Sequence, residues 1–190
     1  MSAPGRLIVV KVGGGLSAIP GALEVVGRAL AEAGRRHRLL VVPGGGPFAD
    51  AVRAFDQREG LSADAAHWMA ILAMDQYAYV LVERIRGAVL VEDPGTIGAA
   101  LRGTGVAVLA PSRWLRAADV LPHDWGATSD SAAAFVAGAL DAERLVLIKP
   151  GSGSATEQVD AHFALVLPMG LRWSTLGWEE VGELERLLDG

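Results

Sequence analysis

Two lysines are the residues of this 190-residue chain whose type and position most suggest chemistry. The chain carries 17 basic residues, but only Lys11 and Lys149 are lysines and the others are Arg. We interpret this bias as a general replacement of Lys by Arg that spares positions where only a compact ammonium fits, because a guanidinium is a planar fork. Each lysine stands near the end of an apolar run, where its charge faces a cleft or, in the alternative interpretation, solvent.

Two glycine triplets follow apolar runs and indicate a site for a phosphate-rich ligand. Glycine lets the backbone approach a ligand and aim several N–H groups at it, and a helix after each triplet favours an anion at its start. A side chain at position 45 is expected to block a positive φ and the approach of a phosphate. The alternative is a pair of tight turns. The residues are Gly13, Gly14 and Gly15 in the first loop, and Gly44, Gly45 and Gly46 in the second.

A capping sequence adds a carboxylate. Thr128 and Ser129 are good helix N-cap residues, and Asp130 follows just inside the expected helix. Asp130 either only stabilises the helix start or projects into the same cleft as the glycine loops. The catalytic interpretation predicts that Asp130→Asn melts normally and loses activity, and the structural interpretation predicts the reverse.

Composition excludes several classes of function. Without cysteine there is no disulfide, thiolate metal site or cysteine nucleophile, and the 4 histidines are too scattered to suggest a zinc site. A net charge of -5 argues against a nucleic-acid binder. The apolar runs are shorter than the about 20 residues of a membrane span, and no signal peptide opens the chain. We therefore expect a cytoplasmic protein that binds neither nucleic acid nor membrane.

The glycine loops also differ from well-known motifs. Lys11 precedes its glycines, whereas a P-loop has Lys and Ser or Thr after them, and neither G-x-G-x-x-G nor G-x-S-x-G occurs. The loops instead punctuate an alternation of strands and helices, which predicts an α/β fold with a parallel sheet covered on both faces. We expect strands at 7–12, 39–42, 88–91, 106–109 and 145–149, helices at about 19–33, 48–57, 62–86, 94–102, 128–140 and 178–188, and an irregular segment at 111–125.

Four motifs, in this order and spacing, resemble the amino acid kinase superfamily. They are Lys11–Gly15, Val41–Ala49, Thr128–Ser131 and Leu145–Lys149. The resemblance implies one domain over 1–190, a three-layer αβα sandwich with a mostly parallel central sheet. It also implies an acceptor-side lobe over about 1–110, a nucleotide-side lobe over about 111–190, and binding of ATP and Mg²⁺ over the carboxyl ends of the strands.

The resemblance further implies roles for individual residues. Lys11, Asp130 and Lys149 would be catalytic, with Asp130 organising the two lysines. Mg²⁺ would be held mainly by phosphates and water rather than by protein ligands. Trp125 could pack against a flat acceptor ring, with a core or interface role as the alternative. The ATP and phosphate contacts would be Gly13, Gly14, Gly15, Thr128, Ser129, Lys149, Gly151 and Gly153, and the acceptor contacts Gly44, Gly45, Gly46, Phe48 and Trp125.

Within the superfamily, one branch is most similar. The segments 43–50, 124–131 and 159–163 resemble the kinases that convert [5-(aminomethyl)furan-3-yl]methyl phosphate to its diphosphate in methanofuran biosynthesis. The branch implies a small phosphate acceptor, and the superfamily implies a homodimer or larger homo-oligomer. A uridylate, isopentenyl phosphate or acyl-acid kinase and a non-catalytic nucleotide- or oxyanion-binding protein are the alternatives. The run from Lys149 to Gly153 replaces an acidic turn of the superfamily, which leaves the adenine contacts open.

Overall fold

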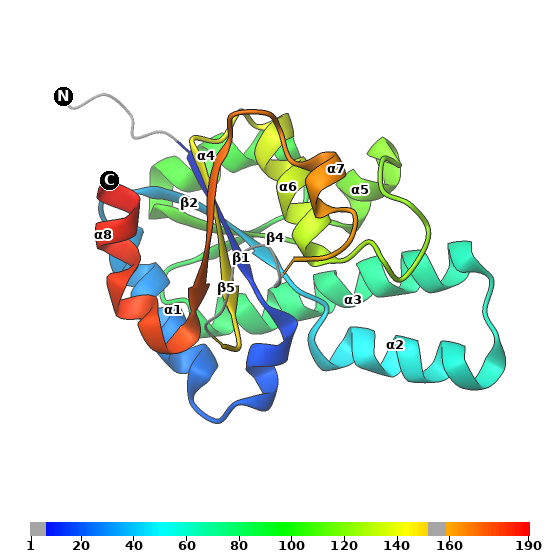
Figure 1. The fold of residues 1–190 in the computed structure, drawn as a ribbon. Helices are drawn as coiled ribbons and strands as arrows, with labels where there is room; N and C mark the ends of the chain where they lie inside the picture. The colour runs from blue at the N-terminus through cyan, green and yellow to red at the C-terminus, as the bar shows by residue number, and fades with distance from the viewer. Residues whose placement is uncertain (1–6, 152–158) are drawn as a thin grey trace.

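The computed structural model describes residues 7–151 and 159–190. In this part of the chain, six strands form one sheet in the order β3-β4-β2-β1-β5-β6, and every neighbouring pair is parallel (Figure 1). The sheet is thus wholly parallel, and the expected α/β class is confirmed. The strands are β1 Leu7–Val12, β2 Arg38–Pro43, β3 Val89–Val91, β4 Val106–Leu109, β5 Arg144–Lys149 and β6 Arg172–Gly177.

Helices cover both faces of the sheet. Successive residues of a central strand point to opposite faces, and in these strands both sets are mainly apolar and need to be buried. In β1, Ile8 and Val10 pack against one helical layer and Val9 against the other. The helical segments are η1 Gly14–Ala18, α1 Ala22–Ala33, α2 Gly46–Glu59, α3 Ala63–Arg84, α4 Pro94–Thr104, α5 Ser112–Ala118, α6 Ser129–Ala139, α7 Phe163–Val166, η3 Trp178–Glu183 and α8 Leu184–Asp189.

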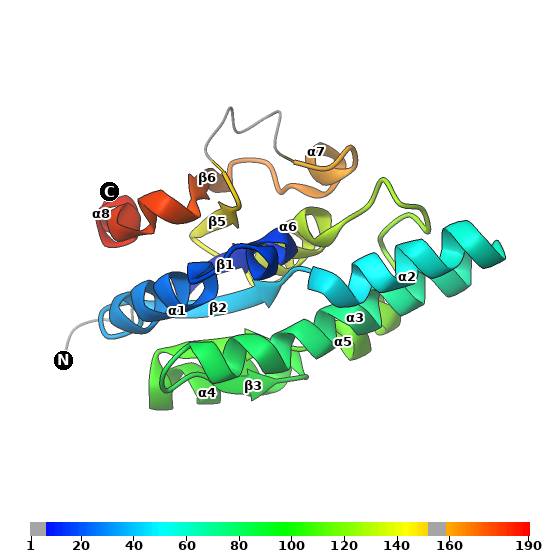
Figure 2. The same ribbon diagram turned by 90° about the horizontal axis from the view of Figure 1, so that it is seen from below.

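The two layers have different members. One contains α1, η3 and α8, and the other contains α4, α5 and α6, while α3 contributes side chains to both cores. The helices α2 and α3 lie side by side and extend beyond the sheet on the side where β2 ends (Figures 1 and 2). This pair of helices forms a wall next to the carboxyl ends of the strands. No helix in the described ranges is long and apolar enough to span a membrane.

The sequence missed three elements at the periphery. The edge strand β6 has the sequence RWSTLG, which contains no apolar run, and only its last two residues are buried. The short helix α5 lies in the segment expected to be irregular, and the Asp75 carboxylate accepts a hydrogen bond from the N–H of its first residue, Ser112, at 2.9 Å. The four-residue helix α7 has no sequence signal of its own. The helix expected at about 19–33 begins only at Ala22, because Gly21 adopts φ 80° before α1, and the separate 3-10 segment η1 precedes it.

Candidate active site

A buried carboxylate stands between the two lysines of the chain. The Lys149 ammonium lies 2.5 Å from Oδ2 of Asp130, and the Lys11 ammonium lies 2.8 Å from Oδ1. Exposed fractions are 4% for Lys11, 3% for Asp130 and 9% for Lys149, so none is a solvated surface charge. With both amines protonated, these three groups together carry a net charge of +1.

Strand alternation explains why the three side chains meet. Lys11 follows Val9 by two residues in β1, and Lys149 follows Leu147 by two residues in β5. Val9 and Leu147 both face the layer that contains α6, and residues two apart in a strand share a face. Asp130 occupies the first turn of α6. Both lysines therefore point to the helix start that carries the carboxylate.

The electrostatics of the cluster favour an anionic ligand. Burial lowers the pKa of Lys149, and the charge of Lys11 lowers it further, against the opposing effects of Asp130 and, more weakly, Asp160. The Lys11 ammonium meets Asp130 outside hydrogen-bond geometry, and it has no hydrogen-bond acceptor among the described residues. An anion placed beside Lys11 would gain a hydrogen-bond donor and a nearby positive charge.

The two glycine loops dock onto each other through their backbones. A Cβ on Gly14 would lie 2.3 Å from the backbone nitrogen of Gly46, and a Cβ on Gly44 would lie 2.4 Å from the nitrogen of Gly14. The positive φ expected at Gly45 is wrong: it lies at Gly46, with φ 56°, whereas Gly45 is right-handed at φ -80°. Close contact between the loops is thus one reason for the glycines, besides any role toward a ligand.

Amide donors at the docked loops are only partly committed. The Gly13 N–H donates to the Ile148 carbonyl at 2.9 Å, and the Gly44 N–H donates to the Val12 carbonyl at 2.8 Å, so neither faces a ligand. Gly14 and Gly15 open η1 and Gly46 opens α2, where N–H groups have no intrahelical acceptor. These helix starts, rather than Gly13 or Gly44, present backbone donors.

The start of α6 already has an anion, which sequence reasoning did not place in the site. Oδ2 of Asp160 accepts hydrogen bonds from the N–H and hydroxyl of Thr128, at 3.0 and 2.7 Å, and from the N–H of Ser131 at 3.0 Å. Burial acts to raise the pKa of Asp160, but the hydrogen bonds from Ser131 and Thr128 outweigh it and the pKa is lowered. Thr128 was expected to bind phosphate, yet both of its donors are committed to Asp160.

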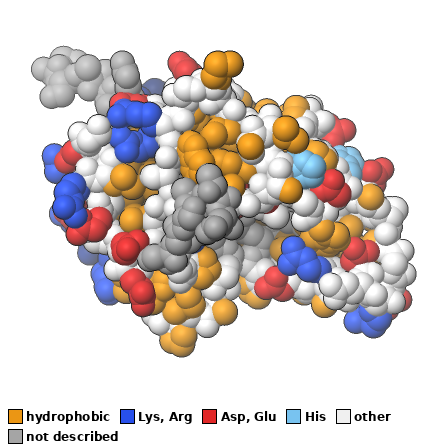
Figure 3. Space-filling view, viewed as in Figure 1, with side chains coloured by type: hydrophobic (Ala, Val, Ile, Leu, Met, Phe, Trp, Pro, Cys, Tyr) orange, Lys and Arg blue, Asp and Glu red, His pale blue; other side chains and the backbone are white. Residues whose placement is uncertain are grey.

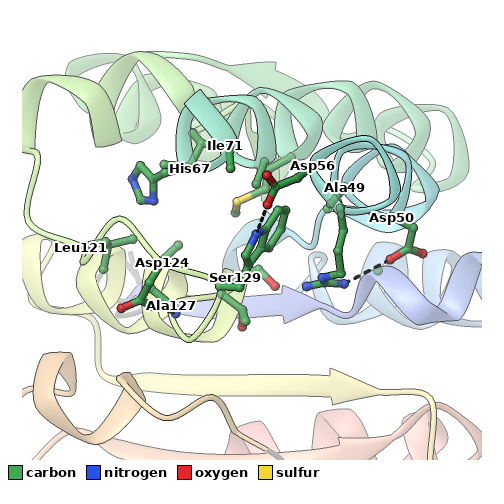
Figure 4. Close-up of a pocket in the computed structure, with 18 of the residues that line it drawn as sticks. Ala49, Asp50, Asp56, His67, Ile71, Leu121, Asp124, Ala127 and Ser129 are labelled. Atoms are coloured by element: carbon green, nitrogen blue, oxygen red, sulfur yellow. Dashed lines mark hydrogen bonds and ion pairs between the residues drawn. The ribbon is translucent and has the colours of Figure 1, made fainter. Parts of the chain in front are cut away.

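A pocket of about 520 Å³ opens beside the glycine loops. Ala49 and Asp56 of α2, His67 and Ile71 of α3, and Ser129 of α6 belong to its wall (Figure 4). Its remaining lining residues are Gly14, Gly15, Gly45, Gly46, Asp50, Arg53, Leu61, Ala63, Ala66, Ala70, Met74, Leu121, His123, Asp124, Trp125, Ala127, Thr128 and Ala132.

The pocket contains one of the two expected aromatic contacts. Trp125 lines it, and the indole N–H donates to Oδ2 of Asp56 at 2.8 Å while the Arg53 guanidinium lies 4.6 Å from the ring centroid. Phe48 is not among the lining residues and packs against the core of the layer that contains α1, η3 and α8. The next residue, Ala49, faces the pocket instead. Of the remaining expected contacts, Gly151 is exposed after β5, and Gly153 lies outside the described residues.

The donor set of the site fits a metal ion held by a ligand rather than by the protein. In residues 7–151 and 159–190, no group of three or more His, Asp or Glu side chains could hold a metal ion. The Asp130 carboxylate is already engaged by two ammonium groups. Mg²⁺ commonly keeps waters and binds through substrate phosphates, so the residues present agree with that mode of binding.

Comparison with known proteins assigns the family. The family model described as "Amino acid kinase family" matches residues 6–153, most of the chain. The chain belongs to the amino acid kinase family. This amino acid kinase family member is 29% identical over 140 residues to the [5-(aminomethyl)furan-3-yl]methyl phosphate kinase of Methanocaldococcus jannaschii. The match covers 73% of this chain, and the chain spans 63% of the length of that curated relative.

Solved structures agree with the fold of the family. The UMP kinase of Bacillus anthracis superposes with a TM-score of 0.69 at 13% identity, covering 99% of this chain and 93% of that one. The uridylate kinase of Archaeoglobus fulgidus gives a TM-score of 0.61 at 17% identity, covering 82% of this chain and 69% of that one. At these identities the likeness concerns the fold alone.

Proposed function

We propose that this protein transfers a phosphoryl group from ATP to a small phosphorylated acceptor and forms a diphosphate. The observation that carries the proposal is the buried cluster of Lys11, Asp130 and Lys149, in which one carboxylate holds two ammonium groups at the same end of the sheet as two docked glycine loops. Phosphoryl transfer depends mainly on positioning and on neutralising charge, which this cluster supplies.

The residues of the cluster have distinct tasks in the proposed reaction. ATP, when bound with Mg²⁺, supplies the phosphoryl group. Lys11 and Lys149 neutralise charge on phosphate oxygens, and Asp130 holds both ammonium groups in place. Gly14 and Gly15 donate backbone N–H groups from the start of η1. No general base is required, because the phosphate of the acceptor is already an anion.

For the acceptor we propose [5-(aminomethyl)furan-3-yl]methyl phosphate. Two features support this choice: the relation to the Methanocaldococcus jannaschii enzyme over 140 residues, and a pocket of about 520 Å³ with the flat indole of Trp125 in its wall. Gly45 and Gly46 lie where the acceptor phosphate would meet the α2 start. We further propose that the protein works in the cytoplasm as a homo-oligomer, with the exposed Leu72 and Tyr79 of α3 as part of the contact.

A transfer assay tests the proposed function. The protein is incubated with ATP and Mg²⁺ and, in separate reactions, with the aminomethylfuran phosphate, UMP and isopentenyl phosphate, and diphosphate products are followed by ³¹P NMR. We expect the furan diphosphate to form fastest and the Asp130→Asn variant to form none. Faster conversion of UMP or isopentenyl phosphate would replace the acceptor, and nucleotide binding without any transfer would replace the kinase by a binding protein.

A further inference from the structure

One polar side chain in the wall of the acceptor pocket has no partner. His67 of α3 is 8% exposed, lines the pocket, and has no hydrogen bond to any described residue. The ring nitrogens of His67 are not fully enclosed by protein atoms, so they are open to the pocket that the side chain lines. His67 therefore has hydrogen-bonding capacity to offer to whatever occupies the pocket.

The neighbour of His67 fixes its charge. His123 stacks on His67 with ring centroids 4.0 Å apart and an interplanar angle of 19°. Nδ1 of His123 lies 2.6 Å from an Asp64 oxygen and Nε2 lies 2.9 Å from an Asp119 oxygen. Because each ring nitrogen faces a carboxylate, both carry a proton and His123 is an imidazolium, and these hydrogen bonds raise its pKa.

His67 itself is held neutral. Burial lowers its pKa, and the charge of His123 lowers it further, which outweighs the opposite effects of Asp119, Asp64 and Asp124. A third ring, that of Trp68, meets His67 edge-on at 4.7 Å, and the Arg116 guanidinium lies 4.8 Å from the Trp68 ring centroid. A neutral imidazole has one nitrogen that can only accept a hydrogen bond, so His67 seeks an N–H or O–H donor.

The surrounding charge selects a cationic donor. The pocket lining on the His67 side includes the carboxylates of Asp56 and Asp124 and the imidazolium of His123, whereas Asp50, which pairs with Arg53 at 3.5 Å, lies on the other side of the pocket (Figure 4). In Figure 4, Asp124 and Leu121 lie on the loop across from His67. Histidines also stand among acidic side chains on the molecular surface toward the α2 and α3 side (Figure 3). This end of the pocket thus has an anionic excess, whereas the glycine-loop end is cationic.

We propose that His67 is a specificity-determining residue of the acceptor pocket, and that it accepts a hydrogen bond from a protonated primary amine at the end of the acceptor opposite its phosphate. The inference rests on the proposed function in placing the acceptor phosphate at the glycine loops. The pocket then binds a bipolar molecule, which has an anionic group at one end and an ammonium group at the other. An uncharged or purely apolar end group leaves His67 without a donor.

A matched pair of acceptors tests the inference. One is [5-(aminomethyl)furan-3-yl]methyl phosphate, and the other is furan-3-ylmethyl phosphate, which lacks only the aminomethyl group. For the wild type we expect kcat/KM to favour the amine by about 10- to 100-fold, as for a hydrogen bond to a charged group. His67→Phe keeps a ring to stack on His123 and loses the acceptor nitrogen, so the preference should disappear through a higher KM for the amine, with kcat unchanged.

Two further variants separate recognition from folding. His67→Gln keeps a neutral hydrogen-bond acceptor and should retain part of the preference. His37 does not line the pocket and pairs with Asp189 instead. His37→Phe should therefore leave the preference for the amine unchanged. Lowering the pH until His67 protonates should also abolish the preference while furan-3-ylmethyl phosphate, which lacks the amine, is still used.

Ligand-induced shifts of the melting temperature, measured with the same two phosphates, separate the proposed kinase function from the proposed role of His67. A preference for the amine in binding without turnover would overturn the proposed function and support the role of His67. Turnover of both acceptors with equal kcat/KM would support the kinase and overturn the role of His67. Retention of the amine preference in His67→Phe would overturn it as well.

Discussion

The glycine-loop end of the pocket and its His67 end differ in what holds them together. At the glycine-loop end, the strands position the functional groups: Lys11 and Lys149 stand near strand ends, and the backbones of the two loops are in contact. At the other end, side chains from α2, α3 and the 121–125 segment meet across the pocket, as Trp125 meets Asp56. Substitutions at the glycine-loop end should therefore disturb the fold, whereas a single side chain at the His67 end can be replaced without doing so.

The largest effect is expected at the carboxylate between the lysines. Asp130→Asn should lower turnover by more than about 10³-fold, because it removes the group that orients both ammonium groups. Contrary to the expectation from sequence, the melting temperature should fall too, since two buried cations lose their counter-charge. Steady-state kinetics and thermal melting check both, with the exposed Glu179→Gln as a control. A variant with normal turnover would remove Asp130 from the mechanism.

A smaller loss is expected when one cation of the pair is removed. Lys11→Ala should reduce kcat by about 10²–10³-fold, the usual cost of one positioned donor. Asp130 keeps Lys149 as its partner, so the fold should persist. Lys11→Arg should not restore activity, because the planar guanidinium cannot replace a buried ammonium point charge. Full activity of the Arg variant would show that only the charge matters.

The docked loops should not tolerate the addition of even one methyl group. Gly14→Ala places a Cβ 2.3 Å from the Gly46 nitrogen, so stability should fall by about 1–3 kcal/mol and activity should fall with it. Gly103→Ala is the matched control, because a Cβ there meets nothing within 4 Å, and in the last turn of α4 it should not lower stability. Urea unfolding measures both, and equal stabilities would refute tight docking.

At the other end, single side chains should change only acceptor binding. Trp125→Phe loses the hydrogen bond to Asp56 and should raise the acceptor KM by about 3- to 10-fold with kcat nearly constant. Phe48→Leu should leave KM unchanged, because Phe48 packs outside the pocket. If Phe48→Leu raised KM as much as Trp125→Phe, the division between the two ends would be wrong.

The smallest effect is expected from the anion at the α6 start, and it depends on pH. The pKa of Asp160 is lowered in the folded protein, so its contribution to stability is present above the usual carboxyl pKa and is lost as the pH falls through the folded pKa. Asp160→Asn should melt lower at neutral pH, and this gap should close in acid below pH ~4. Melting curves from neutral to acidic pH test this, and a constant gap would contradict it.

The sequence predicted best where contacts follow from neighbours in the chain. Lys11 and Lys149 could be singled out because strand alternation and the scarcity of lysine both act locally, and Asp130 because it follows a cap. Asp160 was missed because it reaches Thr128 across 32 positions, and no spacing rule links the two. His67 was missed for the same reason, since its meaning comes from a ring on another segment.

Phe48 shows where sequence is less informative. The family resemblance implied that it contacts the acceptor, but residues of a helix point in directions about 100° apart, and Phe48 is not among the pocket-lining residues. One position along α2 decides between the core and the pocket, and Ala49 holds the pocket position. Loop location is therefore readable from sequence, whereas the face of the following helix is settled only by packing.

Anion binding at the Lys11, Asp130 and Lys149 cluster would also connect the concentration of phosphate ligands with the thermal stability of the protein. Any anion that binds there only in the folded protein shifts the folding equilibrium by mass action, by about 2.7 kcal/mol at a concentration 100 times its Kd. For a chain of this size, that corresponds to a rise of about 5–10 °C in melting temperature. The heat tolerance of the protein should consequently follow the supply of its phosphate ligands.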